Sequence, residues 1–301
     1  MHPLLDRVRN GEILISDGAM GTFLIAKGLA AGECPESWCV SHPDAVRDVH
    51  RAYINAGADI VETNSFGGSR LKLQSYGLAD RAAELNRAAA RLAKAVAAGK
   101  GYVFGSVGPT GQMLKEDHGT ASSEDVYAAY KEQVIALAEG GADAICGETF
   151  FSLHEATQAI RAAKENTQLP VICTFTFNLG KRGFRTMMGA TPEQAAQTAL
   201  DAGADIVGTN CGNGITNMIE IVKLMRAALP NTPLLVHANA GLPVIEDGKT
   251  VYKETPEFMA SKVRELLAAG ASIVGGCCGT TPEHIAAMKK AALDRQAAVS
   301  L

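Results

Sequence analysis

The sequence repeats one short unit along most of its 301 residues. The strand-like part of the unit is an apolar run rich in β-branched residues, and an Ala-rich helical stretch follows each run. The runs are continuously apolar, which is typical of parallel strands covered on both faces. Eight such units predict an α/β protein with a single (β/α)8 barrel (TIM barrel), the alternative being a doubly wound open sheet. The predicted strands are residues 13–16, 59–63, 102–107, 144–149, 171–177, 205–210, 234–239 and 272–276.

The boundaries of the units carry signals of their own. Four predicted strands follow a Gly-Ala-Asp or Gly-Ala-Ser sequence that begins at Gly57, Gly141, Gly203 or Gly270. Glycine there suits the left-handed position that ends a helix. Thr-Pro at 191–192 and at 281–282 places a capping hydroxyl before a proline, which predicts two helix starts. No linker divides the chain, so we expect one domain over residues 1–301.

Composition and charge exclude several classes of function. The formal net charge is −4, from 28 basic and 32 acidic residues, and no basic run indicates a nucleic-acid partner. No apolar run reaches the roughly 18–20 residues of a membrane span. The first residues lack the apolar core and cleavage site of a secretory signal. The seven cysteines are therefore expected to be free thiols or metal ligands in a cytoplasmic protein.

Three cysteines follow predicted strands at their carboxyl ends, where the active sites of such barrels lie. Cys211 follows the sixth strand, and Cys277 and Cys278 follow the eighth. Three thiolates that leave a fourth position open form a catalytic type of zinc site. The alternatives are small buried side chains or a redox pair at 277–278. The other cysteines are interpreted as bystanders: Cys34, Cys39, Cys146 and Cys173.

Acidic and backbone groups at the same strand ends indicate a site for an amino acid. Asp17 and Glu148 can bind an ammonium group, although Asp17 could instead cap the next helix. Backbone N–H groups of a turn can bind the carboxylate. The residues of that turn are Gly18, Ala19, Met20, Gly21 and Thr22.

Three further side chains near the strand ends receive weaker assignments. Glu62 is expected to stabilise the rim by hydrogen bonding. His237 is either a proton carrier or a supporting or solvent-facing residue. His284 is expected to face solvent. Glu62 and His237 lie near the ends of predicted strands, and His284 follows the last one.

Seven motifs occur in order along nearly the whole chain: DGAMGT, TNSFGG, VGPTGQ, GETF, TNCG, NAGLP and GGCCGTTP. In these motifs the chain resembles the homocysteine S-methyltransferase family, in particular the N-terminal homocysteine-binding domain of cobalamin-dependent methionine synthase. The resemblance implies a zinc enzyme that transfers a methyl group to the thiol of homocysteine, giving methionine. It implies zinc ligands at Cys211, Cys277 and Cys278, amino-group ligands at Asp17 and Glu148, and carboxylate contacts from residues 18–22. It also implies that Asn210 and Asn239 shape the pocket.

The methyl donor remains open at this point. Betaine-dependent relatives bind a quaternary ammonium with aromatic rings, but Gly67 follows Phe66 where those enzymes carry an aromatic residue, and only 5% of the chain is aromatic. The likeness to methionine synthase favours methylcobalamin or another methylated corrinoid on a separate protein, with betaine and S-methylmethionine as alternatives.

Two other readings of the barrel are weaker. A Schiff-base aldolase needs a strand lysine, which none of the eight predicted strands contains. A non-catalytic zinc barrel would need a fourth protein ligand to close its metal site.

Overall fold

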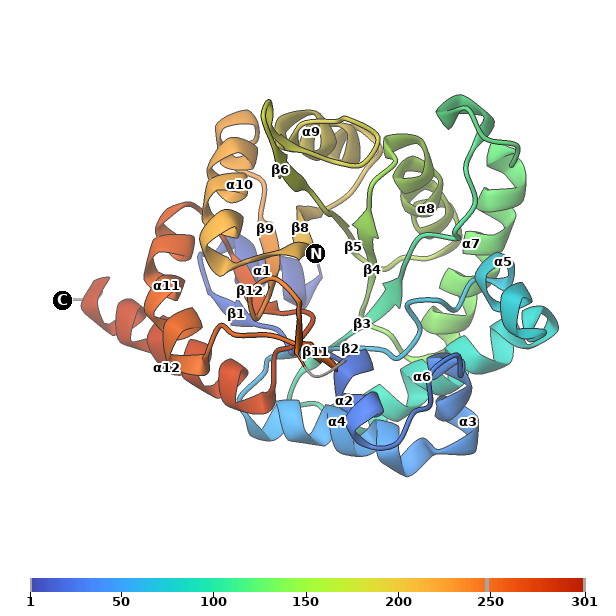
Figure 1. The fold of residues 1–301 in the computed structure, drawn as a ribbon, viewed down its shortest axis with the longest axis horizontal. Helices are drawn as coiled ribbons and strands as arrows, with labels where there is room; N and C mark the ends of the chain where they lie inside the picture. Colours follow the sequence, from blue (N-terminus) through green and yellow to red (C-terminus); the bar gives the residue numbers. More distant parts are fainter. Residues whose placement is uncertain (1, 247–248, 300–301) are drawn as a thin grey trace.

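The computed structural model describes residues 2–246 and 249–299. Eight parallel strands pair in the order β1-β12-β9-β8-β5-β4-β3-β2. A parallel bridge between Ser16 and Ile60 joins β1 to β2 and closes the ring. Figure 1 shows the strands at the centre of a ring of helices. The predicted (β/α)8 barrel is thus confirmed. The strands are β1 (Leu14–Ile15), β2 (Ile60–Glu62), β3 (Tyr102–Val107), β4 (Ala144–Phe150), β5 (Val171–Phe175), β8 (Ile206–Gly214), β9 (Leu234–Asn239) and β12 (Ile273–Gly276).

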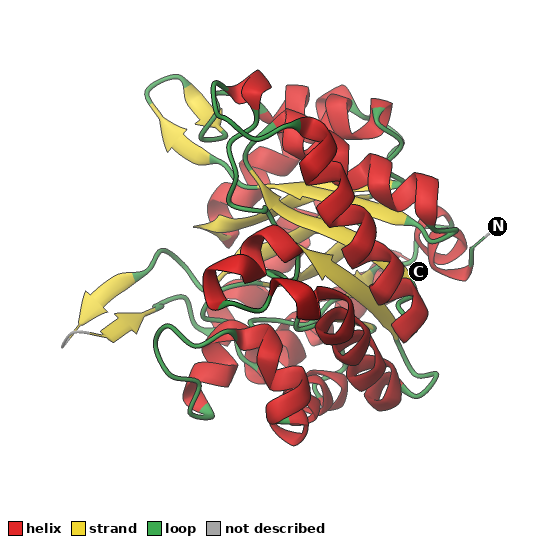
Figure 2. Cartoon of the chain, turned by 90° about the vertical axis from the view of Figure 1, so that its right-hand side faces the viewer, coloured by secondary structure: helices red, strands yellow, loops and turns green. Residues whose placement is uncertain are grey.

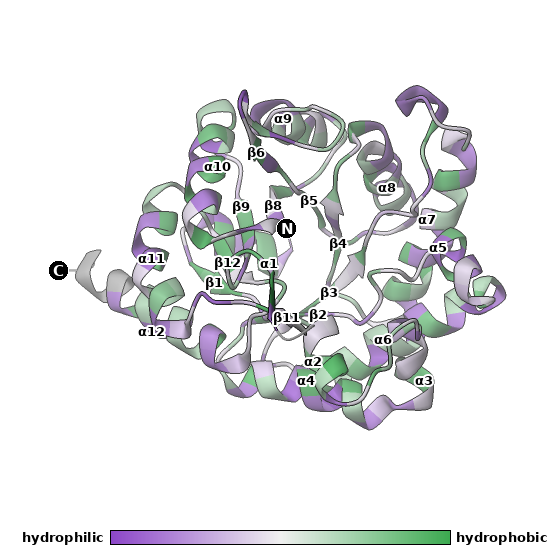
Figure 3. Cartoon of the chain, in the orientation of Figure 1, coloured by the Kyte–Doolittle hydropathy of each residue, from purple (hydrophilic) through white to green (hydrophobic). Residues whose placement is uncertain are grey.

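One long helix follows each barrel strand and packs on the outside of the sheet. Small side chains on the inward faces, such as Ala89 and Ala93, are fully buried and let the helices approach closely. Figure 3 shows hydrophilic residues along the outer parts of the ring. The helices are α4 (Pro43–Asn55), α6 (Ala82–Ala97), α7 (Ser123–Gly140), α8 (Leu153–Asn166), α9 (Pro192–Asp201), α10 (Ile215–Ala228), α11 (Pro256–Ala268) and α12 (Pro282–Val299). Shorter helices are α1 (Pro3–Arg9), α2 (Gly21–Ala26), α3 (Trp38–Ser41) and α5 (Arg70–Leu73).

The predicted boundary signals are present in the structure. Thr191 caps α9 in a capping box with Gln194. The four glycines that precede strands all adopt positive φ, from 97° to 113°, which only glycine adopts without strain. They are Gly57, Gly141, Gly203 and Gly270.

The aspartates after three of these glycines have a structural role that the sequence analysis did not assign. Asp143 accepts the backbone N–H of Val103 on the neighbouring strand at 2.8 Å and pairs with Lys94 at 2.6 Å. Asp59 and Asp205 make the equivalent contacts with the preceding barrel strand and with a lysine. The repeat therefore fixes the amino-terminal ends of the strands with paired charges.

The interior of the barrel changes from apolar to polar along the strands. Alternate residues point inward, and the first inward residue of each strand belongs to one buried apolar cluster. The helix α1 adds Leu4, Leu5 and Val8 to this cluster and covers the amino-terminal end. Two residues further along, several inward positions are polar: Ser16, Glu62, Ser106, Thr174 and His237. The carboxyl-terminal end of the barrel, called the mouth below, is therefore polar.

The structure differs from the sequence prediction at the mouth, where one strand is longer than predicted and two hairpins are present. The strand β8 continues through Cys211 to Gly214 with an irregular register, four residues beyond the predicted end. Two hairpins that were not predicted follow β5 and β9, and Figure 2 shows them projecting on one side of the molecule. They are β6 (Asn178–Gly180) with β7 (Gly183–Arg185), and β10 (Val244–Glu246) with β11 (Lys249–Val251). Among the described residues, no helix is long and apolar enough to span a bilayer.

Candidate active site

The three predicted cysteines meet at the mouth. The Sγ atoms of Cys211, Cys277 and Cys278 lie within 4.8 Å of one another, and those of Cys211 and Cys278 are 3.9 Å apart. Within the described ranges this is the one group of three or more His, Cys, Asp or Glu side chains with the spacing of metal ligands. The other four cysteines are buried away from it. The structure thus separates the three clustered cysteines from the other four, as the sequence predicted.

The backbone around the thiols is held in unusual conformations. Cys211 has φ of +58°, one of four described residues other than glycine with positive φ. A Cβ atom on Gly279 would lie 2.2 Å from the ring of Tyr252, and one on Gly276 would lie 2.2 Å from Thr280 Oγ1. Glycine is therefore required on both sides of the adjacent cysteines.

The electrostatics of the thiol cluster favour a bound cation. Hydrogen bonds from Cys211 and Cys277 lower the pKa of Cys278 to about 3. Hydrogen bonding to the other two sulfurs raises the pKa of Cys277 well above its usual value. The protein alone therefore stabilises a single negative charge on the cluster. Full deprotonation needs a cation, and an all-thiolate donor set with an open position suits Zn²⁺. The residues present fit this metal.

The Tyr252 hydroxyl also hydrogen-bonds to Cys278, a contact that sequence reasoning missed. Tyr252 follows the β10–β11 hairpin, whose presence the sequence did not reveal. No motif pointed to it.

Asp17 lies in the mouth but is not a helix cap. Its Oδ2 accepts the backbone N–H of Glu62 at 2.8 Å, and its Oδ1 accepts from Ser16 Oγ at 3.2 Å. The helix α2 begins at Gly21, its N-cap residue is Met20, and no side chain caps it. The capping alternative is therefore wrong. Burial, only partly offset by these hydrogen bonds, raises the pKa of Asp17 to about 8.

Glu148 and Asn210 form one hydrogen-bonded unit. Glu148 accepts from Ser106 Oγ and, at 3.2 Å, from Asn210 Nδ2. Asn210 Oδ1 in turn accepts from Thr149 N and Thr174 Oγ1 at 2.8 and 2.7 Å. Burial raises the pKa of Glu148 to about 7. Asn210 thus orients Glu148 and the Thr149 backbone, which has φ of +63°.

The loop after β1 is anchored to the loop after β12. The Ala19 N–H donates to Thr280 Oγ1 at 3.2 Å, and Tyr53 Oη donates to the Ala19 carbonyl at 3.0 Å. The Ala19 amide is therefore already engaged within the protein. The amides of Gly18, Met20, Gly21 and Thr22 would have to supply the predicted carboxylate contact.

The two histidines of the seventh and eighth units, His237 and His284, are both buried. His237 is 1% exposed, with Nδ1 3.7 Å from Glu62 Oε2, so the solvent-facing alternative is wrong. His284 is 6% exposed and bonds to Thr281 and to the Glu254 carbonyl, so the prediction that it faces solvent is also wrong. His284 occupies the third position of α12, where a glutamate would complete a capping box, and the side chain therefore turns back to the helix start.

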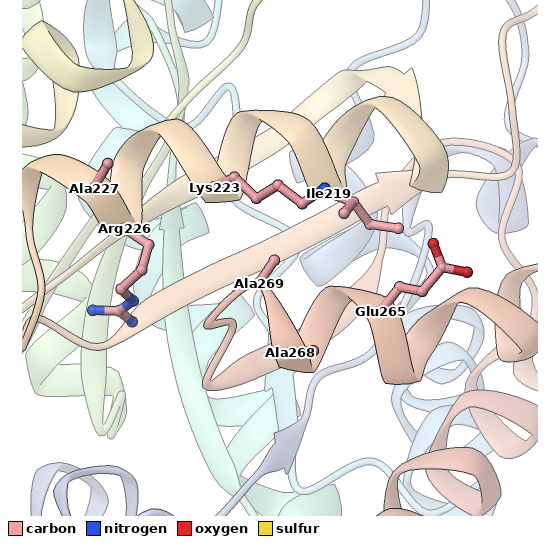
Figure 4. Close-up of a pocket in the computed structure, with 7 residues that line it drawn as sticks. All are labelled: Ile219, Lys223, Arg226, Ala227, Glu265, Ala268 and Ala269. Carbon is pink, nitrogen blue, oxygen red and sulfur yellow. The ribbon is translucent and has the colours of Figure 1, made fainter.

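A groove between α10 and α11 lies on the outer helical layer (Figure 4). The Arg226 guanidinium on its wall donates to the carbonyls of Leu229, Thr232 and Gly270 at 2.7, 2.8 and 2.7 Å. Because these bonds join the elements that precede β9 and β12, Arg226 fixes the fold instead of offering donors to a ligand. The mouth remains the place where reactive groups converge.

Comparison with known proteins agrees with this placement. The chain is 35% identical to methionine synthase of Mycobacterium tuberculosis over 94% of its length, and 32% identical to that of Mycobacterium leprae over 91%. It spans about a quarter of the length of each of these relatives, 25% and 24%. Among solved structures it is similar to the homocysteine methyltransferase MmuM from Escherichia coli. The metallated form has a TM-score of 0.77 and 25% identity, covering 93% of this chain and 96% of that one.

Residues 14–292 match the family described as Homocysteine S-methyltransferase. The match includes all eight barrel strands and the mouth residues discussed above. The resemblance seen in the motifs is thereby confirmed. This chain belongs to the homocysteine S-methyltransferase family.

Proposed function

We propose that residues 1–301 form a homocysteine-binding barrel domain that transfers a methyl group to the thiol of homocysteine, giving methionine. The observation that carries this proposal is the meeting of three thiols within 4.8 Å in a mouth that also holds Asp17 and Glu148. A sulfur-binding centre beside carboxylates suits a substrate with a thiol and an ammonium group. The free thiols of the mouth suit a reducing compartment, and we place the protein in the cytoplasm.

Zn²⁺ is the metal proposed for Cys211, Cys277 and Cys278. A free thiol titrates near 8.5, so only a few per cent is nucleophilic thiolate at neutral pH. When bound, zinc would keep a coordinating substrate thiol deprotonated and leave it as the nucleophile. Three protein ligands leave the position that this chemistry needs, whereas a structural site is normally closed by four.

The protein groups around the metal would bind and orient the amino acid. Asp17 and Glu148 would attract its ammonium group, and the loop of residues 18–22 would receive its carboxylate through backbone N–H groups. Asn210 holds Glu148 in place through their 3.2 Å hydrogen bond, and Asn239 would shape the pocket. These contacts would fix the sulfur for in-line attack on a methyl group and exclude water, so the protein contributes mainly by positioning.

The donor that we propose is a methylated corrinoid carried by a separate protein. Similarity to the two mycobacterial methionine synthases supports it. Both hairpins at the mouth also present exposed apolar side chains, Leu179 and Ile245, which a large carrier could cover. Betaine and S-methylmethionine are the alternatives, and each is small enough to enter the mouth without such a surface.

A donor panel tests the proposal. Zinc-loaded protein and homocysteine are incubated with methylcobalamin, S-methylmethionine or betaine, with and without a chelator, and methionine is measured. We expect methionine from methylcobalamin and its loss with the chelator. Methionine from only one of the two small donors would overturn the corrinoid assignment but keep homocysteine as the acceptor. Methionine formation that resists the chelator would overturn the role of zinc.

A further inference from the structure

Three buried polar atoms inside the barrel have no hydrogen-bond partner: Glu62 Oε1, His237 Nε2 and Asn239 Oδ1. They belong to neighbouring groups. His237 Nδ1 lies 3.7 Å from Glu62 Oε2, and Asn239 is two residues beyond His237 on β9, so both face the barrel interior. Buried polar atoms in native proteins are nearly always paired. Three unpaired atoms together indicate that a ligand completes them.

The carboxyl groups of the mouth differ in how much of their hydrogen-bonding capacity is used. Both oxygens of Asp17 accept hydrogen bonds from the protein, as do both oxygens of Glu148. Glu62 accepts none at Oε1. It is also held at its backbone, because the Glu62 N–H donates to Asp17 Oδ2 at 2.8 Å. Of these three carboxyl groups, Glu62 is therefore the one with an oxygen that accepts no hydrogen bond from the protein.

We propose that Glu62 binds the substrate ammonium group directly, and that Asn239 Oδ1 accepts a second of its hydrogen bonds. His237 is a positioning residue that holds Glu62 from the side of Oε2. This inference rests on the proposed function, since it names the protein groups that bind the amino group of homocysteine. It changes the role of Asp17, which then acts on the substrate partly by orienting Glu62.

The chemistry of the unpaired atoms selects the ligand. Asn239 Oδ1 is an acceptor, Glu62 Oε1 is an acceptor when the carboxyl group is ionised, and Nε2 of His237 is an acceptor when the ring proton is on Nδ1, facing Glu62. A set made only of acceptors suits a group that only donates, and an ammonium has three N–H donors and no acceptor. A carboxylate would leave every one of these atoms unpaired. The positive charge also suits a region with three buried carboxyl groups, since burial and the neighbouring Glu148 and Asp17 raise the pKa of Glu62 well above its usual value.

The test compares two ligands that differ only in the amino group. Binding of homocysteine and of 4-mercaptobutanoate, which lacks the amino group, is measured by calorimetry on zinc-loaded protein. We expect Glu62→Gln to raise the Kd for homocysteine by about 10-fold or more, the value of a charged hydrogen bond, and to change the Kd for 4-mercaptobutanoate by less than about twofold. Glu12→Gln is the matched control, because Glu12 pairs with Arg7 and takes no part in the mouth.

Three further variants, at two positions, guard against a purely structural effect. Asn239→Ala should also lower the preference for homocysteine over 4-mercaptobutanoate. His237→Leu should lower it as well, and His237→Asn should restore part of it, because the Asn amide can donate to Glu62 in place of Nδ1. Each effect is read as a ratio of two Kd values on the same folded protein, so loss of fold alone does not mimic it.

The outcomes separate this inference from the proposed function. Equal losses for both ligands in Glu62→Gln would make Glu62 a structural residue and overturn the inference. No loss for either ligand would place the ammonium elsewhere and overturn it too. In both cases binding of homocysteine by the wild-type protein would leave the proposed function standing. If the wild-type protein binds neither ligand, both proposals fail.

Discussion

The two ends of the barrel interior follow the same backbone pattern with opposite chemistry. At the amino-terminal end the inward side chains pack against Leu4 and Leu5 of α1 in a closed apolar cluster. At the mouth the inward positions on the same strands carry carboxyl, imidazole, amide and thiol groups. Figure 2 places the N-terminus on the side away from the hairpins. One end is thus built for packing and the other for binding.

The difference shows where the fold gives up stability. Polar groups at the amino-terminal strand ends have full partners, as Asp143 has in Val103 N and Lys94 Nζ. At the mouth, burial raises the pKa of both Asp17 and Glu148. Buried groups of this kind destabilise a fold unless a ligand compensates them. Variants at the two ends should therefore fail in different ways, which the following experiments examine.

Removing one thiol at the mouth should have the largest effect. Cys211→Ala leaves two sulfurs of the three that lie within 4.8 Å of one another. We expect loss of tightly bound zinc and a fall in methionine formation of about 10³-fold or more. The three thiols would act as one metal site, so removing one of them should abolish most of the activity that depends on all three. Zinc content is measured by elemental analysis, and activity with the donor identified in the panel.

The matched control is a cysteine outside the mouth. Cys173 lies in β5 and is fully buried in the apolar layer between sheet and helices. Cys173→Ala should cost about 1 kcal/mol of unfolding free energy and leave zinc content and activity unchanged. Retention of zinc and activity by Cys211→Ala would show that the ligand assignment is wrong.

Shortening a side chain at the closed end should affect stability alone. Ile172 is fully buried in the apolar cluster with α1. Ile172→Ala removes three carbons from a packed interior and leaves a cavity, so we expect a loss of about 2–5 kcal/mol in the free energy of unfolding. Urea unfolding measures this loss, and the KM for homocysteine should stay the same. A raised KM would show that the two ends are mechanically coupled.

The fold was predictable because its signals are local and repeated. Continuous apolar runs and the positive-φ glycines at 57, 141, 203 and 270 specify strands and helix ends over a few residues each. The hairpins were missed because their strands are three residues long and mostly exposed, so no burial pattern marks them. The extension of β8 was missed because it runs through two glycines, Gly212 and Gly214, that usually end a strand.

The site was predictable where a residue type has few other uses. Adjacent cysteines between glycines pointed to the thiol cluster, and the structure brings Cys211 beside them. The sequence analysis did not place Glu62 and His237 side by side inside the barrel, although a usable signal existed. Glu62 is two residues beyond Ile60, and His237 two beyond Leu235, so both share the inward face of strands whose apolar members are in the core. Counting that alternation would have placed the two side chains inside the barrel.

Another expected effect concerns the pH dependence of stability. The folded protein holds a proton on Asp17 up to a pH of about 8, whereas the unfolded chain releases it near 3.8. Between these values the native state binds more protons, so the free energy of unfolding falls as pH rises, by up to about 1.4 kcal/mol per pH unit. Asp17→Asn cannot titrate, and it should be more stable than the wild type at pH 8 by a margin that shrinks toward pH 4.

An Asp-to-Asn substitution at the amino-terminal end of the barrel should change the free energy of unfolding in the opposite direction. Asp143→Asn removes the ion pair with Lys94 at 2.6 Å while an amide oxygen can still accept from Val103. We expect it to destabilise the protein by about 0.5–1.5 kcal/mol, and less in high salt because the pair is partly exposed. Urea unfolding of both variants at pH 8 makes the comparison direct. If Asp17→Asn also destabilised the protein at pH 8, the Asp17 carboxylate would be a stabilising charge like that of Asp143, and the contrast between the two ends would fail at that residue.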